Sequence, residues 1–76
     1  MARKPKTLDD LLLKTGESYE AFAKRSGVAR FTLYRIREGK IAKPRRKTLH
    51  DIAQALSLEV ETVQRAVQAS YDAAQS

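Results

Sequence analysis

The sequence contains no cysteine and no tryptophan, and it has a single histidine, His50. Without cysteine, neither a disulfide framework nor a thiolate metal site can form. Because His50 has no second histidine with which to share a metal ion, we expect it to be structural or to lie on the surface. The sequence therefore predicts no metal centre, and the lack of cysteine fits a reducing compartment.

Candidates for catalysis and for cofactor binding are equally scarce. The adjacent carboxylates of Asp9 and Asp10 would point in different directions on a helix and make no acid–base pair. The three glycines are too far apart in the sequence for a loop that cradles a phosphate. We predict that the protein is not an enzyme, needs no cofactor and has no small-molecule ligand.

Long apolar runs are also missing. No stretch approaches the roughly 20 residues that a membrane-spanning helix needs, and no signal-peptide core follows basic residues 1–6. The 76 residues suffice for one small domain, near the lower size at which a core supports itself. We expect a cytoplasmic protein with no membrane partner.

Acidic residues are nearly absent from the middle of the chain. The net charge is +6, and the segment from Lys24 to Lys47 holds ten Lys and Arg residues against one acid, Glu38. Residues 48–76 hold one base, Arg65, against four acids. A polyanion is therefore the expected partner, and the middle of the chain is expected to face it.

Apolar spacing and helix-end signals predict five helices and no strand. The expected helices cover, in order, residues 8–14, residues 19–25, residues 29–38, a segment that follows Thr48, and a segment from about residue 59. Thr7 and Ser18 are expected to cap the first two helices, and Thr48 the fourth. Residues 69–76 are small and polar, so we expect them to fray unless a partner orders them.

The segment from residue 19 to residue 39 has the spacing of two short helices joined by a tight turn. Gly27 supplies the positive φ that ends the first helix, and Leu33 and Ile36 form the buried stripe of the second. This spacing is that of a helix-turn-helix. The expected core contains Phe22, Leu33, Ile36 and Ile52.

Residues 18–40, and more loosely residues 7–69, resemble the Cro/phage-repressor (Xre-type) helix-turn-helix family. Gly-Val-Ala-Arg-Phe-Thr-Leu-Tyr-Arg-Ile-Arg-Glu-Gly-Lys at residues 27–40 is similar to the family's turn and recognition helix. Ile-Ala-Gln-Ala-Leu at residues 52–56 is similar to its fourth helix. The resemblance implies an all-α, compact five-helix, lambda-repressor-like domain that binds operator DNA, usually as a dimer.

This resemblance gives the expected division of the chain. Residues 1–6 form a basic N-terminal arm, residues 7–69 the helix-turn-helix DNA-binding domain, and residues 70–76 a C-terminal tail. The arm is either a disordered solubilising tail or a segment that lies on DNA phosphates or enters a groove.

The exposed face of the third helix is the expected base-reading surface. Arg30 and Arg35 can each donate two parallel hydrogen bonds to guanine, and Phe31 can pack on a thymine methyl group. The Tyr34 hydroxyl could contact a base edge or a phosphate. The alternative is a solvated face for the arginines and burial against a neighbour for Phe31.

Cations beside that helix are expected to neutralise phosphates. They are Lys40, Lys43, Arg45, Arg46 and Lys47. The resemblance implies that Lys43 or Arg45 approaches the minor groove at the operator centre. The alternative is a solvated run of charges.

Two positions depart from the family pattern. Tyr19 stands where the family commonly has a glutamine that grips a phosphate, and its hydroxyl can still donate to one. Leu12 and Arg37 stand where the family often pairs an arginine with a glutamate. Arg37 is thus free either to pair with Asp9 or Asp10 or to reach DNA.

The sequence favours a DNA-binding transcriptional regulator of prokaryotic type, most simply a repressor that occupies an operator. The expected partners are double-stranded DNA and a second copy of the chain in a weak homodimer that forms fully on DNA. Its expected self-contact comprises Val67, Ser70, Tyr71 and Ala74 on the last helix. The alternatives are a protein-interaction adaptor or antitoxin with the same fold, and a nucleic-acid binder that reads only charge.

Overall fold

The structure, a computed structural model, describes residues 6–75. Those residues form five helices and no strand, which confirms the predicted all-α fold. The helices are α1 (Leu8–Leu13), α2 (Tyr19–Ser26), α3 (Arg30–Arg37), α4 (Arg46–Leu56) and α5 (Val60–Gln75). The expected N-terminal arm lies outside the described residues except for Lys6, which is exposed.

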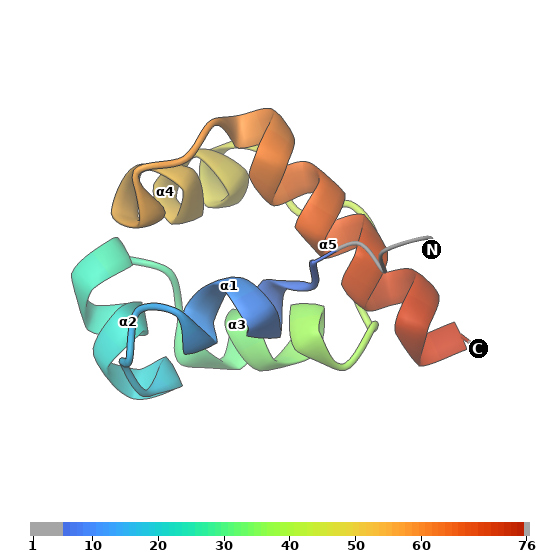
Figure 1. The fold of residues 1–76 in the computed structure, drawn as a ribbon, viewed down its shortest axis with the longest axis horizontal. Coiled ribbons are helices and arrows are strands. Elements are labelled where there is room, and N and C mark those ends of the chain that lie inside the picture. The colour runs from blue at the N-terminus through green and yellow to red at the C-terminus, as the bar shows by residue number, and fades with distance from the viewer. Residues whose placement is uncertain (1–5, 76) are drawn as a thin grey trace.

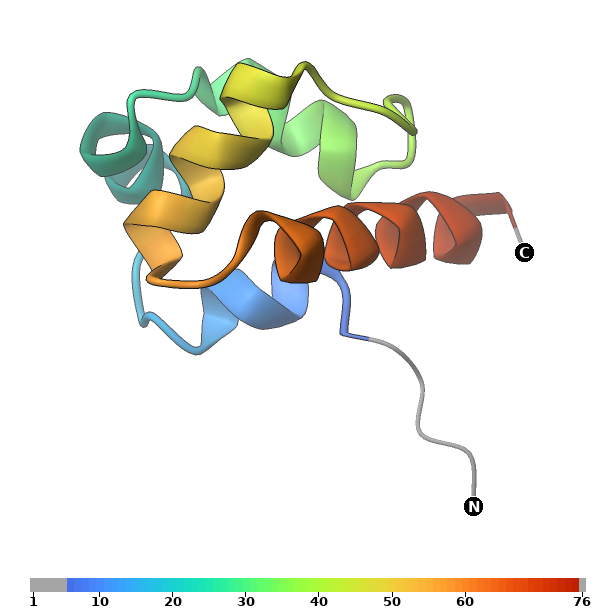
Figure 2. The same ribbon diagram turned by 90° about the horizontal axis from the view of Figure 1, so that it is seen from above.

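The last helix is the element around which the others assemble. α5 packs against α1, α3 and α4, and α2 packs against α3 and α4. Figure 1 shows α4 above α1 and α2, with α5 closing one end of the molecule. In Figure 2, α1 and α3 lie on opposite sides of α5. The two helices of the helix-turn-helix are thus held from behind by α4 and α5.

The first two helices begin at the predicted caps. The Thr7 Oγ1 atom accepts a hydrogen bond from the Asp10 amide at 3.2 Å, and Asp10 Oδ2 accepts one from the Thr7 amide at 3.0 Å. This reciprocal pair satisfies two amides that a helix N-terminus leaves unpaired. The Ser18 Oγ atom likewise accepts from the Ala21 amide at 3.1 Å. Both predicted N-caps are confirmed.

The predicted N-cap of the fourth helix, Thr48, is wrong by three residues. α4 begins at Arg46, and its N-cap residue Arg45 is extended (φ −60°, ψ 149°) with no side-chain cap. Pro44 holds the chain extended just before this point, and Arg46 and Lys47 are good helix formers that need no Ser or Thr to enter the first turn. Two of the cations expected to neutralise phosphates, Arg46 and Lys47, therefore belong to a helix N-terminus.

The expected fraying is not observed for residues 69–75, because α5 continues to Gln75, and residue 76 lies outside the described residues. Ser70 is only 3% exposed, and its Oγ atom accepts a hydrogen bond from the Leu8 amide at 2.9 Å. The same hydroxyl donates to the Ala66 carbonyl at 3.0 Å. The expected boundary between domain and tail at residue 70 falls inside a helix that packs on the domain.

The expected core is confirmed as one cluster. Phe22, Leu33, Ile36 and Ile52 are fully buried together with Leu8 and Val63, among others. α1 adds Leu8 and Leu12, and α5 adds Val63 and Val67. All five helices that the structure describes contribute to this cluster, so the position of α3 depends on the whole domain.

Candidate nucleic-acid interface

The turn between α2 and α3 is set by two residues. Gly27 has φ 79°, in the left-handed region, and its amide donates to the Ala23 carbonyl at 2.9 Å. This conformation ends α2 with little strain, as predicted. Val28 then turns inward and is buried in the core. α3 starts two residues further on and crosses α2 in the helix-turn-helix arrangement.

The buried and exposed sides of α3 are those predicted. Leu33 and Ile36 are fully buried, while Arg30, Phe31 and Arg35 are exposed. The Phe31 side chain is 69% exposed, so burial against a neighbour does not account for it. A large apolar ring held in water by a rigid helix is unusual for a surface that meets only solvent.

The two arginines on this face differ in their partners. Arg30 Nη1 lies 3.7 Å from Glu20 Oε2, and both side chains are more than half exposed. An exposed pair of this kind contributes about 0–1 kcal/mol, so Arg30 can leave it at little cost. Arg35 has no carboxylate partner among residues 6–75, and its guanidinium carbon lies 5.3 Å from the centroid of the Phe31 ring. Phe31 therefore holds the guanidinium of Arg35 by a cation–π contact.

Tyr19 and Tyr34 form a stacked pair beside this face. Their ring centroids are 5.0 Å apart and their planes differ by 9°. The guanidinium carbon of Arg37 lies 5.2 Å from the Tyr19 ring and 5.0 Å from the Tyr34 ring. This cluster ties the start of α2 to the middle of α3 and explains why Tyr34 is only half exposed.

The Tyr19 hydroxyl, expected to donate to phosphate, donates instead to Asp9 Oδ1 at 2.7 Å. Burial raises the pKa of Tyr19 well above its usual range, the hydrogen bond to the Asp9 carboxylate raises it further, and Arg37 opposes the rise. The alternative that pairs Arg37 with Asp9 or Asp10 is wrong, because the described residues show no such salt bridge and the guanidinium contacts the two tyrosine rings. The other alternative, that Arg37 reaches DNA, stays a prediction.

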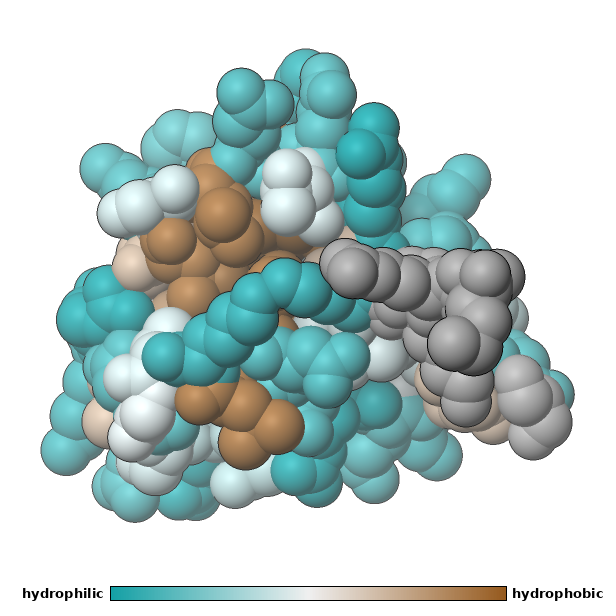
Figure 3. All heavy atoms as spheres, viewed as in Figure 1, coloured by the Kyte–Doolittle hydropathy of each residue, from teal (hydrophilic) through white to brown (hydrophobic). Residues whose placement is uncertain are grey.

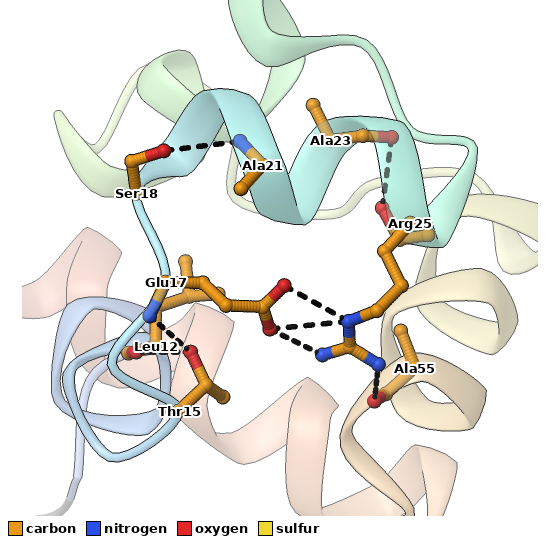
Figure 4. Close-up of polar contacts among 9 residues, drawn as sticks. Leu12, Thr15, Glu17, Ser18, Ala21, Ala23, Arg25 and Ala55 are labelled. Atoms are coloured by element: carbon orange, nitrogen blue, oxygen red, sulfur yellow. Dashed lines mark hydrogen bonds and ion pairs between the residues drawn. The ribbon is translucent and has the colours of Figure 1, made fainter.

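A set of hydrogen bonds around Arg25, which no sequence pattern predicts, holds α2 in place; we call it the Arg25 clamp. Figure 4 shows the Arg25 guanidinium between the Glu17 carboxylate and the end of α4. Its Nε and Nη2 atoms donate to Glu17, the shortest contact being 2.6 Å, and its Nη1 atom donates to the Ala55 carbonyl at 2.6 Å. The hydrogen bond from Arg25 lowers the pKa of Glu17, and the same bond raises the pKa of Arg25. Arg25 thus belongs to the scaffold and not to the cations that face a partner.

The remaining predicted cations lie where α3 leads into α4. Lys40, Lys43 and Arg45 are exposed in the loop, and Arg46 and Lys47 are exposed in the first turn of α4. That turn has no acidic residue, although Lys47 Nζ lies 3.2 Å from Asp51 Oδ2 in the following turn. Cations at a helix N-terminus are unfavourable to the helix dipole, and an anion bound there would offset this cost.

The described residues offer little that would support a metal site or a membrane-spanning segment. No group of three or more His, Cys, Asp or Glu residues that could hold a metal ion is found among residues 6–75. His50 is exposed, and its nearest carboxylate atom is Asp51 Oδ1 at 3.9 Å. None of the helices in residues 6–75 is both long and apolar enough to span a membrane.

The fold and this surface define a helix-turn-helix DNA-binding domain. The family model of the Cro/C1-type HTH DNA-binding domain matches residues 7–68, which is most of the chain. The protein belongs to this family and is a DNA-binding regulator. Comparison with curated proteins and with solved structures gave no significant match.

Proposed function

We propose that the protein regulates transcription by binding a specific DNA sequence, and that it represses by occupying an operator. The observation that supports this most directly is the outer face of α3, where Arg30, Phe31 and Arg35 are exposed on a helix fixed by buried Leu33 and Ile36. Such a helix suits the major groove, where arginine pairs with guanine and phenylalanine packs on the thymine methyl group. Tyr34, at the side of this face, contacts the edge of the same site.

The cations after α3 are proposed as the phosphate contacts. Lys40, Lys43 and Arg45 flank the end of α3, and Arg46 and Lys47 add their charge to the N-terminus of α4. Contacts of this kind supply affinity that does not depend on sequence, and they fix the register of the protein on the duplex. A phosphate contact by Tyr19 requires its hydroxyl to exchange Asp9 for a phosphate oxygen.

We propose that two copies of the chain bind DNA together as a dimer. One recognition helix covers few base pairs, and genomes offer many competing sites. Two-fold symmetry would place the half-sites about 34 Å apart and require a near-palindromic operator. Two of the four residues expected in the self-contact on the last helix, Val67 and Ser70, are buried within the monomer, which leaves only half-buried Tyr71 and exposed Ala74 on that face. We propose instead that the copies meet through the loop after α3 and the start of α4, beside a hollow of about 620 Å³ that includes Pro44, Leu49 and Val60.

The test is selection of bound sequences from a random DNA library, followed by titration of the enriched duplex and a scrambled duplex. We expect one enriched near-palindromic motif and a large affinity ratio between the two duplexes. The matched variants are Arg35→Ala on α3 and Arg65→Ala on α5, which remove the same exposed side chain from different faces. Only Arg35→Ala should reduce the ratio. If no motif is enriched, the proposed sequence specificity is wrong and the protein binds nucleic acid through charge alone.

A further inference from the structure

An apolar groove lies between α1, the end of α4 and the start of α5. Its volume is about 380 Å³, and its apolar lining comes from Leu11, Leu56 and Leu58, with Thr15 and Thr62 beside them. A second hollow of about 220 Å³ shares Leu11 and Thr62 and continues along α5 to Arg65 and Ala66. Figure 3 shows the apolar patch in the space between α4 and α1. The two hollows form one trough along the start of α5.

The trough leaves apolar surface in contact with water. Leu58 is 38% exposed in the connector between α4 and α5, and Leu56 is half-buried. Leu58 is held there by the chain itself, since its amide donates to the Ala53 carbonyl at 2.9 Å. Covering such leucine side chains stabilises a complex in proportion to the area removed from water.

The charged residues that line the trough are all basic. Lys6, Lys14 and Arg65 line it, and none of the lining residues is acidic. No salt bridge joins Lys14 or Arg65 to another residue in the part of the chain that the structure describes. A basic rim around a leucine floor fits a partner with acidic flanks and an apolar centre. The phosphate backbone of a nucleic acid would leave the leucine floor uncovered.

We propose that this trough docks an acidic amphipathic segment of a partner protein, with apolar side chains on the leucine floor and carboxylates toward Lys14 and Arg65. The trough lies beside α1, which Figure 2 places on the opposite side of α5 from α3. The partner and DNA can therefore be bound together. The inference does not depend on the proposed function, because none of the residues proposed to contact DNA lines the trough.

The probe is a random peptide library displayed on phage and selected against the whole chain, with the enriched peptides then synthesised and titrated by fluorescence anisotropy. We expect enriched peptides with apolar residues at helical spacing and several Asp or Glu residues. Added salt should weaken their binding. A library that enriches no peptide, or only basic ones, would overturn the proposal.

Matched charge reversals locate the binding surface. Lys14→Glu and Arg65→Glu change exposed side chains on the rim, and Lys24→Glu makes the same change in net charge on α2. Exposed charge pairs contribute modestly, so each single rim variant should bind the peptides roughly threefold more weakly, while Lys24→Glu, with the same change in net charge, changes little. Leu58→Glu should abolish binding. Melting temperatures close to that of the unaltered chain check that the variants fold.

Competition with DNA separates the remaining outcomes. The peptides should bind equally well with and without a saturating 20-base-pair duplex. Peptides that the duplex displaces, or that bind the rim variants as well as the unaltered chain, would place their site elsewhere and overturn the proposal. So would a larger loss of duplex affinity in the rim variants than in Lys24→Glu, because the trough would then be a nucleic-acid surface.

Discussion

Gly39, just past the end of α3, lies directly against Ala74 in the last turn of α5. A Cβ atom on Gly39 would overlap the Cβ atom of Ala74, and Gly39 has φ 76°, where side chains are strained. The Gly39 amide donates to the Ile36 carbonyl at 3.1 Å and the Lys40 amide to the Arg35 carbonyl at 2.9 Å, which closes α3. The end of the recognition helix and the end of α5 are thus fitted to each other.

Gly39→Ala should destabilise the fold through both the overlap and the positive φ. The conformational part costs about 1–2 kcal/mol and the overpacking about 1–3 kcal/mol. Ala74→Gly removes only the overlap, so the double variant should be more stable than the two single effects predict, by about 1 kcal/mol or more. Urea unfolding of the four proteins measures this coupling, and strict additivity would mean that the two residues do not meet.

Phe31→Ala should impair two base contacts at once. It removes the ring proposed to pack on a thymine methyl, and it releases the guanidinium of Arg35, 5.3 Å from the ring centroid. Replacing the contacted thymine by uracil should weaken the unaltered protein by about 0.8 kcal/mol, the value of one buried CH₂ group, and should leave Phe31→Ala unaffected. Titration of the four protein–DNA combinations gives the coupling. If replacing thymine by uracil weakens binding equally in both proteins, Phe31 does not contact the thymine methyl group.

Replacing Lys43, Arg45 and Arg46 by Gln should weaken binding to all sequences. Each lost phosphate contact should reduce the slope of log affinity against log salt by about 0.9. The helices should remain, since these side chains are exposed and none forms a salt bridge with another described residue. Titrations at several salt concentrations measure the slope, and an unchanged slope would mean that these cations do not touch DNA.

Tyr19→Phe tests whether the Tyr19 hydroxyl works inside the protein or on DNA. Loss of the hydrogen bond to Asp9 should cost about 1 kcal/mol of folding free energy. If the hydroxyl acts only within the protein, the salt dependence of DNA binding should stay the same. A slope reduced by about one unit would instead assign it a phosphate contact.

Glu17→Gln should change the response of the fold to acid. Because the hydrogen bond from Arg25 lowers the pKa of Glu17 in the folded state, its contribution is complete at neutral pH and is lost as pH falls through that lowered pKa. The variant should therefore melt at a lower temperature than the unaltered chain at pH 7, and the difference should shrink below about pH 4, under the ordinary pKa of glutamate. Glu61→Gln, an exposed glutamate on α5, is the control. A difference that stays constant from pH 7 to pH 3 would contradict the Arg25 clamp.

Local patterns allowed most of the fold to be predicted. Thr7, Ser18 and Gly27 mark helix ends through bonds that span three or four residues, and Leu33 with Ile36 marks a buried face through helical spacing. The exposed positions on α3 follow from the same spacing. These features could be predicted because their causes lie within one helix.

Contacts between distant residues could not be predicted in this way. The charge pattern alone places Arg25 among the cations that face a partner, because no sequence neighbour indicates its bonds to Glu17 and to Ala55, which is 30 residues away. Residues 69–76 were expected to fray because their composition is small and polar, yet α5 needs small side chains where Ala74 meets Gly39. A threonine at position 48 suggests a cap there, yet α4 begins at Arg46 directly after extended Arg45 and has no side-chain cap.

The hydrogen bond from the Leu8 amide to Ser70 joins residues 62 positions apart. During synthesis, α1 leaves the ribosome first and has neither this acceptor nor the α5 side chains that cover it. A nascent chain that already contains α2 and α3 still lacks Val63 and Val67 from the cluster that holds α3. The ability to bind DNA should therefore be acquired late, after translation has passed α5, and a premature stop within α5 should yield a chain for proteolysis rather than a partly active regulator.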